Sequence, residues 1–174
     1  MHKELFQLRN LNNNDIKEYI NFLLDPDISV WLEDEVQNIK DYSSIENYLL
    51  HGWYRQAIEY NEKFIGVSGL DLINEKNKVA RFFIVIGKKE LWGKGIGLGV
   101  IKSIVKYGFH ELSLRKINSD FLIPNEGVKI IHEKAGFKHE GFLRKDSFRN
   151  NNWIDREIVS IFPESVDGTS TLDL

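Results

Sequence analysis

The fold is decided by a glycine-rich stretch that reads Leu91-Trp92-Gly93-Lys94-Gly95-Ile96-Gly97-Leu98-Gly99. Residues 79–86 before it are almost continuously apolar, which predicts a central strand, and residues 98–112 after it have the period of an amphipathic helix. Glycines let the backbone approach an anion, and the N–H groups of a helix N-terminus attract negative charge. We therefore predict a phosphate-binding loop between a strand and a helix, with Lys94 as its cation.

A glycine-rich turn that binds nothing is the plain alternative for this stretch. Four alternate glycines argue against it, because glycine loses more conformational entropy on folding than any other residue. Two common phosphate loops also fit poorly. A P-loop places Lys and then Ser or Thr after its last glycine, whereas here Leu98 follows Gly97. A dinucleotide-binding loop has the spacing G-x-G-x-x-G, whereas the glycines here are spaced G-x-G-x-G-x-G.

Outward from this loop, helical and strand periods alternate, and short hairpins exclude a purely parallel sheet. The fold class is therefore α/β in the broad sense, an α+β layered domain. We expect Asn13 or Asn14 to cap the first helix and Asp25-Pro26 to end it. Predicted helices cover residues 13–24, a segment that begins at Ser43, and residues 125–135 with Gly136 as the C-terminal cap. Predicted strands cover residues 54–60, 63–72, 116–123, 137–147 and 153–162.

Three motifs follow one another along about residues 3–162. The first is strand 82–87 running into the loop at 92–97. The second is Asn125-Glu126 followed by Glu133-Lys134-Ala135-Gly136-Phe137, and the third is Glu140-Gly141-Phe142-Leu143-Arg144 with the closing hairpin. In order and spacing they resemble the acyl-CoA site of the Gcn5-related N-acetyltransferase (GNAT) superfamily. The resemblance is strongest to its branch of ribosomal-protein N-terminal acetyltransferases and spermidine acetyltransferases.

This resemblance implies one GNAT-like domain over residues 1–162. Residues 163–174 are rich in Ser, Thr, Asp and Gly and lack periodicity, which predicts a polar, flexible tail. Its sheet would be mixed, mostly antiparallel and splayed at the acyl-CoA site, with helices on both faces. The implied reaction is acetyl-CoA-dependent acetylation of a primary amine: a polyamine, an amino sugar or a protein N-terminus. A homodimer or larger homo-oligomer is common in this branch. The residues that the resemblance assigns to acetyl-CoA are Ile84, Val85 and Ile86 for the pantetheine arm, Trp92, Gly93, Lys94, Gly95, Ile96, Gly97 and Leu98 for the pyrophosphate, and Asn125.

The chain departs from the family pattern at Trp92, where many relatives have Gln or Arg, and at Arg81, where relatives often have a Glu. His132 stands where many relatives carry a Tyr that donates a proton to the departing CoA thiolate. Histidine can donate in either charge state, so His132 is the candidate general acid, with a buried helix histidine as the alternative. These departures also motivate a second hypothesis, a non-catalytic acyl-CoA-binding or regulatory module. The general base stays unassigned among Glu33, Asp34, Glu35, His51 and Asp155.

An acidic run after the first predicted helix is the candidate acceptor site, with Trp31, Glu33 and Glu35 as its members. Carboxylates attract a polyamine, and an indole ring packs on methylene or ammonium groups. An ordinary solvated acidic loop is the alternative. The last hairpin suits an anionic nucleotide-sugar substrate or is simply a charged surface; its basic residues are Arg144, Lys145, Arg149 and Arg156.

Composition adds exclusions. The chain has 174 residues and no cysteine, which excludes disulfides, thiolate metal sites and a cysteinyl intermediate, and leaves direct transfer in a ternary complex. We expect no metal. With 23 Lys and Arg against 26 Asp and Glu, neither nucleic acid nor a membrane is an expected partner. No apolar run approaches the roughly 18 residues of a membrane span, and no secretory signal is recognised, so a cytoplasmic location is expected.

Overall fold

The structure is a computed structural model that describes residues 6–32, 36 and 42–166. The chain divides into two compact units. The first unit consists of Met1–Gly69 and Ile84–Val100, and the second consists of Leu70–Phe83 and Ile101–Leu174.

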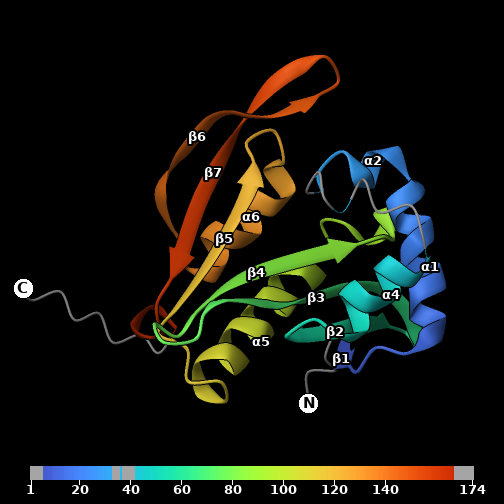
Figure 1. Ribbon diagram of the computed structural model, residues 1–174, viewed down its shortest axis with the longest axis horizontal. Helices are drawn as coiled ribbons and strands as arrows, with labels where there is room; N and C mark the ends of the chain where they lie inside the picture. Colours follow the sequence, from blue (N-terminus) through green and yellow to red (C-terminus); the bar gives the residue numbers. More distant parts are fainter. Residues whose placement is uncertain (1–5, 33–35, 37–41, 167–174) are drawn as a thin grey trace, which may run out of the picture. The chain divides into compact units, whose positions relative to one another are not determined.

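Helices and strands alternate along the chain much as the hydrophobic periods predict (Figure 1). The elements up to the glycine-rich loop are β1 (Gln7–Arg9), α1 (Asn13–Leu24), α2 (Pro26–Ser29), α4 (Tyr42–Leu50), β2 (Tyr54–Tyr60), β3 (Lys63–Asn74), β4 (Val79–Ile86) and the 3-10 helix η1 (Lys89–Leu91). The later elements are α5 (Ile96–His110), β5 (Lys116–Leu122), α6 (Glu126–Ala135), β6 (Lys138–Arg149), β7 (Asn152–Ile161) and the 3-10 helix η2 (Pro163–Ser165).

Within the described residues, the strands form a seven-stranded sheet in the order β1-β2-β3-β4-β5-β7-β6. The β1–β2, β5–β7 and β6–β7 pairs are antiparallel, and β4 and β5 are parallel, which confirms the predicted mixed sheet. The parallel register consists of Val79–Lys116, Ala80–Ile117 and Arg81–Asn118. It therefore covers only the first three residues of each strand, although β4 continues to Ile86 and β5 to Leu122.

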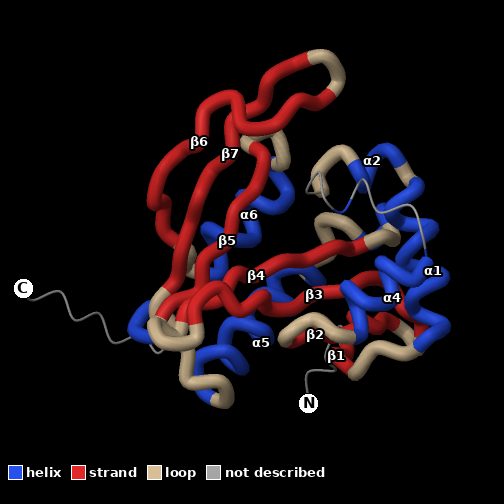
Figure 2. The backbone as a smooth tube through the Cα atoms, in the orientation of Figure 1, coloured by secondary structure: helices blue, strands red, loops and turns tan. Residues whose placement is uncertain are grey.

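Tight turns explain why two of the strand pairs form hairpins. Asn61 and Glu62, between β2 and β3, have φ values of 47° and 61°. Asn150 and Asn151, between β6 and β7, have φ values of 49° and 62°. Two successive left-handed residues match the twist of the flanking strands, so such turns favour a hairpin. Both connections lie where the polar residues of the sequence predict them, and Figure 2 shows the long β6–β7 hairpin.

The caps of α1 correct one prediction. Asn12, rather than Asn13 or Asn14, is the N-cap, and the Asp15 carboxylate accepts the Asn12 backbone N–H at 2.9 Å. Asp15 is buried, and two nitrogens of the Arg9 guanidinium donate to its oxygens at 2.7 and 2.9 Å. These hydrogen bonds offset the cost of burying the Asp15 carboxylate, which caps the helix and pairs with Arg9 at the same time.

Other boundaries also differ from expectation. A short helix, α2, begins at Pro26, where the sequence predicts only an end, because proline suits the first helical position. The helix α4 includes Tyr42, so Ser43, the predicted first residue, lies inside the helix. The predicted flexible tail begins with η2, and its residues 167–174 lie outside the described residues.

In the second unit, β5 has two chemically different faces. Ile117 packs against α5, and the Ser119 hydroxyl lies 2.8 Å from the ring of His132 on α6. Residues at alternate positions point to opposite faces of a strand. The face away from these helices therefore carries Asn118 and Asp120.

Two features, a membrane-spanning helix and a metal-binding cluster, are absent from the described ranges. No helix there is long and apolar enough to cross a membrane. No group of three or more His, Cys, Asp or Glu residues there is arranged to hold a metal ion.

The close approach of β3 to β4 generates a stability prediction. A Cβ atom on Gly66 would lie 2.1 Å from the carbonyl oxygen of Val85, so Gly66→Ala must displace backbone. We expect a loss of about 2–3 kcal/mol in the free energy of unfolding, measured in urea. Gly141→Ala is the control, because a Cβ there meets nothing within 4 Å. Equal stability of Gly66→Ala and the wild type would contradict this packing.

Candidate active site

The predicted phosphate loop connects the end of β4 to the start of α5 in the first unit. After η1, Gly93 and Gly95 have φ values of 74° and 83°. These values lie in the left-handed region, which glycine adopts without strain and other residues do not. The two glycines turn the chain into α5, which begins at Ile96, two residues before the predicted start. The glycine pattern thus has a conformational reason at two of its positions.

The start of α5 presents N–H groups that have no acceptor inside the helix. The Gly99 N–H donates to the Gly95 carbonyl at 3.1 Å, so the N–H groups of residues 96–98 precede the helical ladder. A Cβ on Gly93 or Gly95 would meet no atom within 4 Å, which leaves open space over the loop backbone. Free N–H groups, a helix N-terminus and an uncrowded backbone together fit a phosphate group.

The lysines around the loop divide into two kinds. Lys88 pairs with Glu18 of α1 at 2.5 Å, and Lys89 pairs with Asp25 at 2.9 Å. The hydrogen bond to Asp25 is the main cause that raises the pKa of Lys89 to about 12. These pairs hold η1 against the α1–α2 corner. Lys94, by contrast, is exposed and forms no ion pair with any described residue, so its ammonium can meet an anionic ligand.

Trp92 ties the start of the loop to the end of β4. Its indole N–H donates to the carbonyl oxygen of Ile86 at 2.9 Å, and the residue is 45% exposed. This bond occupies one of the backbone acceptors predicted for the pantetheine arm. The predicted backbone contacts of Ile84 and Val85 with that arm stay predictions.

Asn125 lies in the second unit as the N-cap of α6. Its side-chain oxygen accepts the Val128 N–H at 3.3 Å. Gly136 ends the same helix with a φ of 97°, as the sequence predicts. The capping role of Asn125 is confirmed, and its contact with pantetheine stays a prediction.

His132 is buried on α6, with 2% of the residue exposed. Removal from water is the main cause that lowers its pKa to about 4. The ring is therefore neutral at physiological pH. It packs among aromatic rings whose centroids lie 4.9–5.8 Å from its own: Phe82, Phe121 and Phe137.

The hydrogen bonds of His132 define its tautomer. Nδ1 lies 2.8 Å from the Val128 carbonyl oxygen, and Nε2 lies 2.8 Å from the Ser119 hydroxyl. Because a carbonyl can only accept, Nδ1 carries the hydrogen. Nε2 of the neutral ring then accepts the Ser119 hydroxyl hydrogen, and the other acceptor near that hydroxyl, the Phe82 carbonyl oxygen, lies farther away at 3.3 Å. A proton could leave Nδ1 only after the bond to Val128 breaks. The general-acid role of His132 stays a prediction.

The candidate acceptor residues are only partly described. Trp31 is half-buried after α2, and its backbone N–H donates to the Ile28 carbonyl oxygen at 3.1 Å. His51 is exposed after α4. The Asp155 carboxylate accepts the Lys145 backbone N–H at 2.7 Å, which braces the last hairpin. The acidic candidates of the predicted acceptor run lie outside the described residues: Glu33, Asp34 and Glu35.

Arg156 is not the surface cation that one interpretation of the hairpin predicts. It is 9% exposed; its Nε donates to Asp146 at 2.5 Å, Nη2 donates to Ser147 at 3.2 Å, and Nη1 donates to Asp120. Asn118 and Asp120 are not among the site residues predicted from the sequence. The available signal is polar residues at two alternate positions of a predicted inner strand, where apolar residues are usual.

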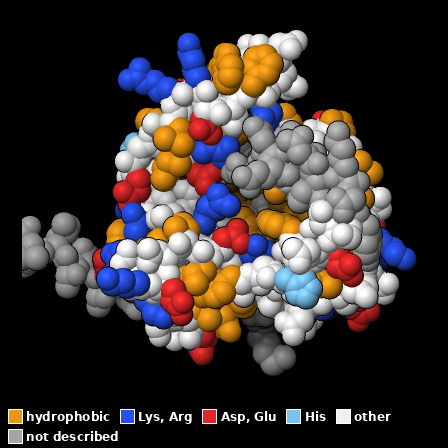
Figure 3. All heavy atoms as spheres, viewed as in Figure 1, with side chains coloured by type: hydrophobic (Ala, Val, Ile, Leu, Met, Phe, Trp, Pro, Cys, Tyr) orange, Lys and Arg blue, Asp and Glu red, His pale blue; other side chains and the backbone are white. Residues whose placement is uncertain are grey.

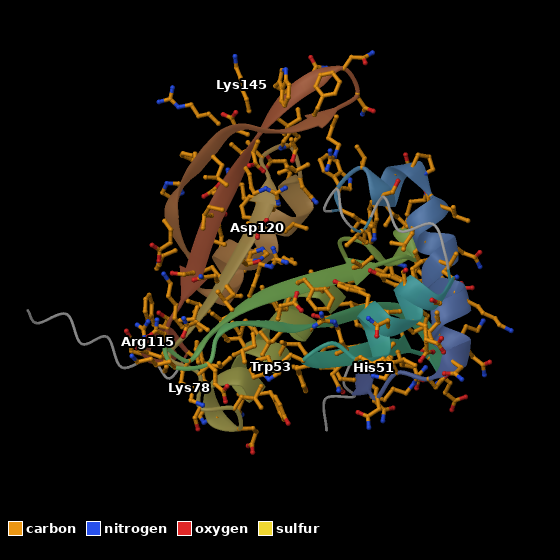
Figure 4. All side chains as sticks on the ribbon, viewed as in Figure 1. His51, Trp53, Lys78, Arg115, Asp120 and Lys145 are labelled. Atoms are coloured by element: carbon orange, nitrogen blue, oxygen red, sulfur yellow. The ribbon has the colours of Figure 1, made fainter. Side chains whose placement is uncertain are left out.

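The tip of the last hairpin keeps the charged surface that the sequence predicts. Hydrophobic and basic side chains gather there (Figure 3), and Lys145 points outward in Figure 4. Phe148 and Trp153 are 52% and 61% exposed, with ring centroids 5.1 Å apart. A substrate-binding role for this surface stays a prediction.

The neutral ring of His132 generates a pH prediction. Between about pH 6.5 and pH 4 the unfolded chain binds a proton at His132 that the folded chain excludes, so this stability is full above pH 6.5 and is lost as the pH falls toward 4. We expect the wild type to lose about 2 kcal/mol more than His132→Gln between about pH 7 and pH 5, measured in urea. Parallel pH dependence in the two proteins would contradict the buried neutral ring.

Comparison with known proteins gives a family match. Residues 6–138 match the family described as acetyltransferase (GNAT) domain. The spermidine N(1)-acetyltransferase of Escherichia coli (strain K12) is 29% identical over 163 residues, which cover 90% of this chain and 85% of the relative. The probable N-acetyltransferase YjcK of Bacillus subtilis (strain 168) is 39% identical over 69 residues, 40% of this chain and 38% of that protein.

Solved structures share the fold. The spermidine N-acetyltransferase from Vibrio cholerae, in complex with CoA and spermine, has a TM-score of 0.81 and 24% identity, and the match covers 94% of this chain and 99% of that one. A chimera of the Vibrio cholerae enzyme with hSSAT has a TM-score of 0.78 and 25% identity over 91% and 96% of the two chains. Because the family match covers well over half of the sequence, the chain belongs to the GNAT acetyltransferases, which transfer the acetyl group of acetyl-CoA to an amine.

Proposed function

We propose that this acetyltransferase moves the acetyl group of acetyl-CoA directly to a primary amine of a polyamine. The glycine loop carries the donor half of the proposal. It combines open space over Gly93 and Gly95, the N–H groups of residues 96–98 and the ammonium of Lys94, which pairs with no described carboxylate. A pyrophosphate needs several donors on one anion, and this loop supplies them from backbone.

The donor would bind along consecutive segments of the first unit. Backbone N–H groups from Gly93 to Leu98 hold the pyrophosphate, and Lys94 adds a positive charge. Trp92 keeps the loop on the end of β4 through its bond to Ile86. The pantetheine arm pairs with the backbone of Ile84 and Val85, as an added strand would. The short register of β4 with β5, which ends at Arg81, supports this assignment.

The chemistry is an acyl transfer to nitrogen. The neutral amine attacks the thioester carbonyl carbon, a C–N bond forms, and the C–S bond breaks as the tetrahedral intermediate collapses. The sulfur leaves with the bonding electrons and takes a proton, and the nitrogen loses one. The chain contains no cysteine, so no cysteinyl thioester carries the acetyl group, which supports direct transfer in a ternary complex.

The named substrates of related proteins support a polyamine as the acceptor. The Escherichia coli relative is a spermidine acetyltransferase, and the Vibrio cholerae structure contains spermine. The run Trp31, Glu33 and Glu35 would attract such a cation. The Vibrio cholerae enzyme also has a dodecameric structure, and we propose a homo-oligomer here.

The loop assignment is tested by matched lysine variants. Lys94→Ala should raise the dissociation constant of CoA about fivefold to tenfold in calorimetry, and by less at high salt, because a charge on the phosphate is lost. Lys102→Ala, which removes an exposed lysine further along α5, should leave the constant unchanged. Gly95→Asp adds bulk and negative charge and should abolish binding. Unchanged affinity in Lys94→Ala and Gly95→Asp would remove the loop from the donor site.

Turnover separates the enzyme from a binding module of the same fold. Thiol release from acetyl-CoA is measured with spermidine, with an amino sugar and with a peptide N-terminus. We expect release with spermidine. CoA binding without release on any amine would favour the non-catalytic module, and no CoA binding would exclude both.

A further inference from the structure

We infer that Asn118 receives the amino group of the acceptor through its side-chain oxygen, beside the carboxylate of Asp120. This inference rests on the proposed function and adds to it the residues that recognise the amine. Both residues lie on β5 in the second unit, and Figure 4 labels Asp120.

A row of polar side chains crosses one face of the sheet. Asp71 of β3 pairs with Arg81 of β4 at 3.8 Å. Arg81 is the register partner of Asn118, so in a parallel pair both side chains lie on the same face. Asp120 follows Asn118 on that face two residues later. The row ends with the bonds from Arg156 to Asp120 and Asp146.

The charges of this polar row favour a cation. Within the described part of the row, three carboxylates, those of Asp71, Asp120 and Asp146, face the two guanidinium groups of Arg81 and Arg156. Carboxylates therefore outnumber guanidinium groups along this row. The centre of the row is sheltered, since the Asp120 side chain is 14% exposed. A charge that is shielded from water attracts an ammonium more strongly than a surface charge does.

Asn118 adds an unpaired acceptor to this face. Its Oδ1 atom is buried and has no hydrogen-bond partner among the described residues. Native proteins rarely leave such an acceptor unpaired, because burying it without a donor destabilises the fold. A ligand N–H would satisfy it. Asp120, whose carboxylate accepts from Arg156, follows two residues later on the same face of β5.

Asn118 lies where the pairing of β4 with β5 ends. Arg81 and Asn118 are the last pair of the β4–β5 register. Asn118 also lies on the opposite face of β5 from Ser119, which bonds to His132. The hydrogen-bonded Ser119 hydroxyl and the unpaired Asn118 oxygen therefore lie on opposite faces of β5.

The test uses Asn118→Leu, which keeps the approximate volume and removes the polar atoms. Spermidine binding and CoA binding are measured by calorimetry, with the melting temperature of each protein. We expect spermidine affinity to fall about tenfold or more, because a hydrogen bond from a charged group is lost. CoA affinity should stay within about twofold, and the melting temperature should hold or rise, because a buried unpaired acceptor is removed. Asn118→Ala serves if leucine does not fit.

Asn77→Leu, the same change on the turn between β3 and β4, is the control and should leave both affinities unchanged. Unchanged spermidine affinity in Asn118→Leu, or a lower melting temperature with equal losses for both ligands, would overturn the inference. Wild-type protein that binds spermidine without acetylating it would contradict the proposed function and leave the role of Asn118 testable by binding. Wild-type protein that binds no spermidine would overturn both.

Discussion

The N–H groups at the start of α5 have no acceptor inside the helix, and the proposed donor site is built around them. Residues 96–98 precede the first helical hydrogen bond, so these donors need an acceptor from outside the helix. The surrounding structure keeps them accessible. Left-handed Gly93 and Gly95 turn the chain without side chains above the backbone, and Trp92 fixes the loop to Ile86. The ligand that we propose for these donors is the pyrophosphate of acetyl-CoA.

Buried polar groups in the second unit divide by whether the protein itself satisfies them. His132 has hydrogen bonds at both ring nitrogens and aromatic contacts around its ring, which joins α6 to β5 in the neutral state. Arg156 is likewise held by Asp120 and Asp146. The Asn118 side-chain oxygen has no hydrogen-bond partner within the part of the chain that the structure describes. A satisfied group mainly stabilises the fold, whereas an unsatisfied one destabilises it unless a ligand completes it. This contrast is why we assign the amine to Asn118.

Local patterns allowed most of the fold and the donor loop to be predicted. The apolar run Val79–Ile86 and the polar turns at Asn61-Glu62 and Asn150-Asn151 are each readable from a few neighbouring residues. The polar row could not be predicted, because its partners are far apart in sequence: Asp120 and Arg156 are separated by 36 positions. They meet because β7 lies between β5 and β6, an order that periodicity does not encode. The burial of His132 depends in the same way on rings from β4, from β5 and from Phe137, the residue before β6.

The central claim is that backbone donors of the glycine loop hold the pyrophosphate of acetyl-CoA. Amide hydrogen exchange measures these donors directly, with CoA and with pantetheine, which lacks the pyrophosphate, as ligands. Our account predicts that CoA slows exchange at residues 93–98 and that pantetheine does not, because the bound phosphate oxygens accept these hydrogens. CoA binding that leaves exchange at these residues unchanged would contradict it.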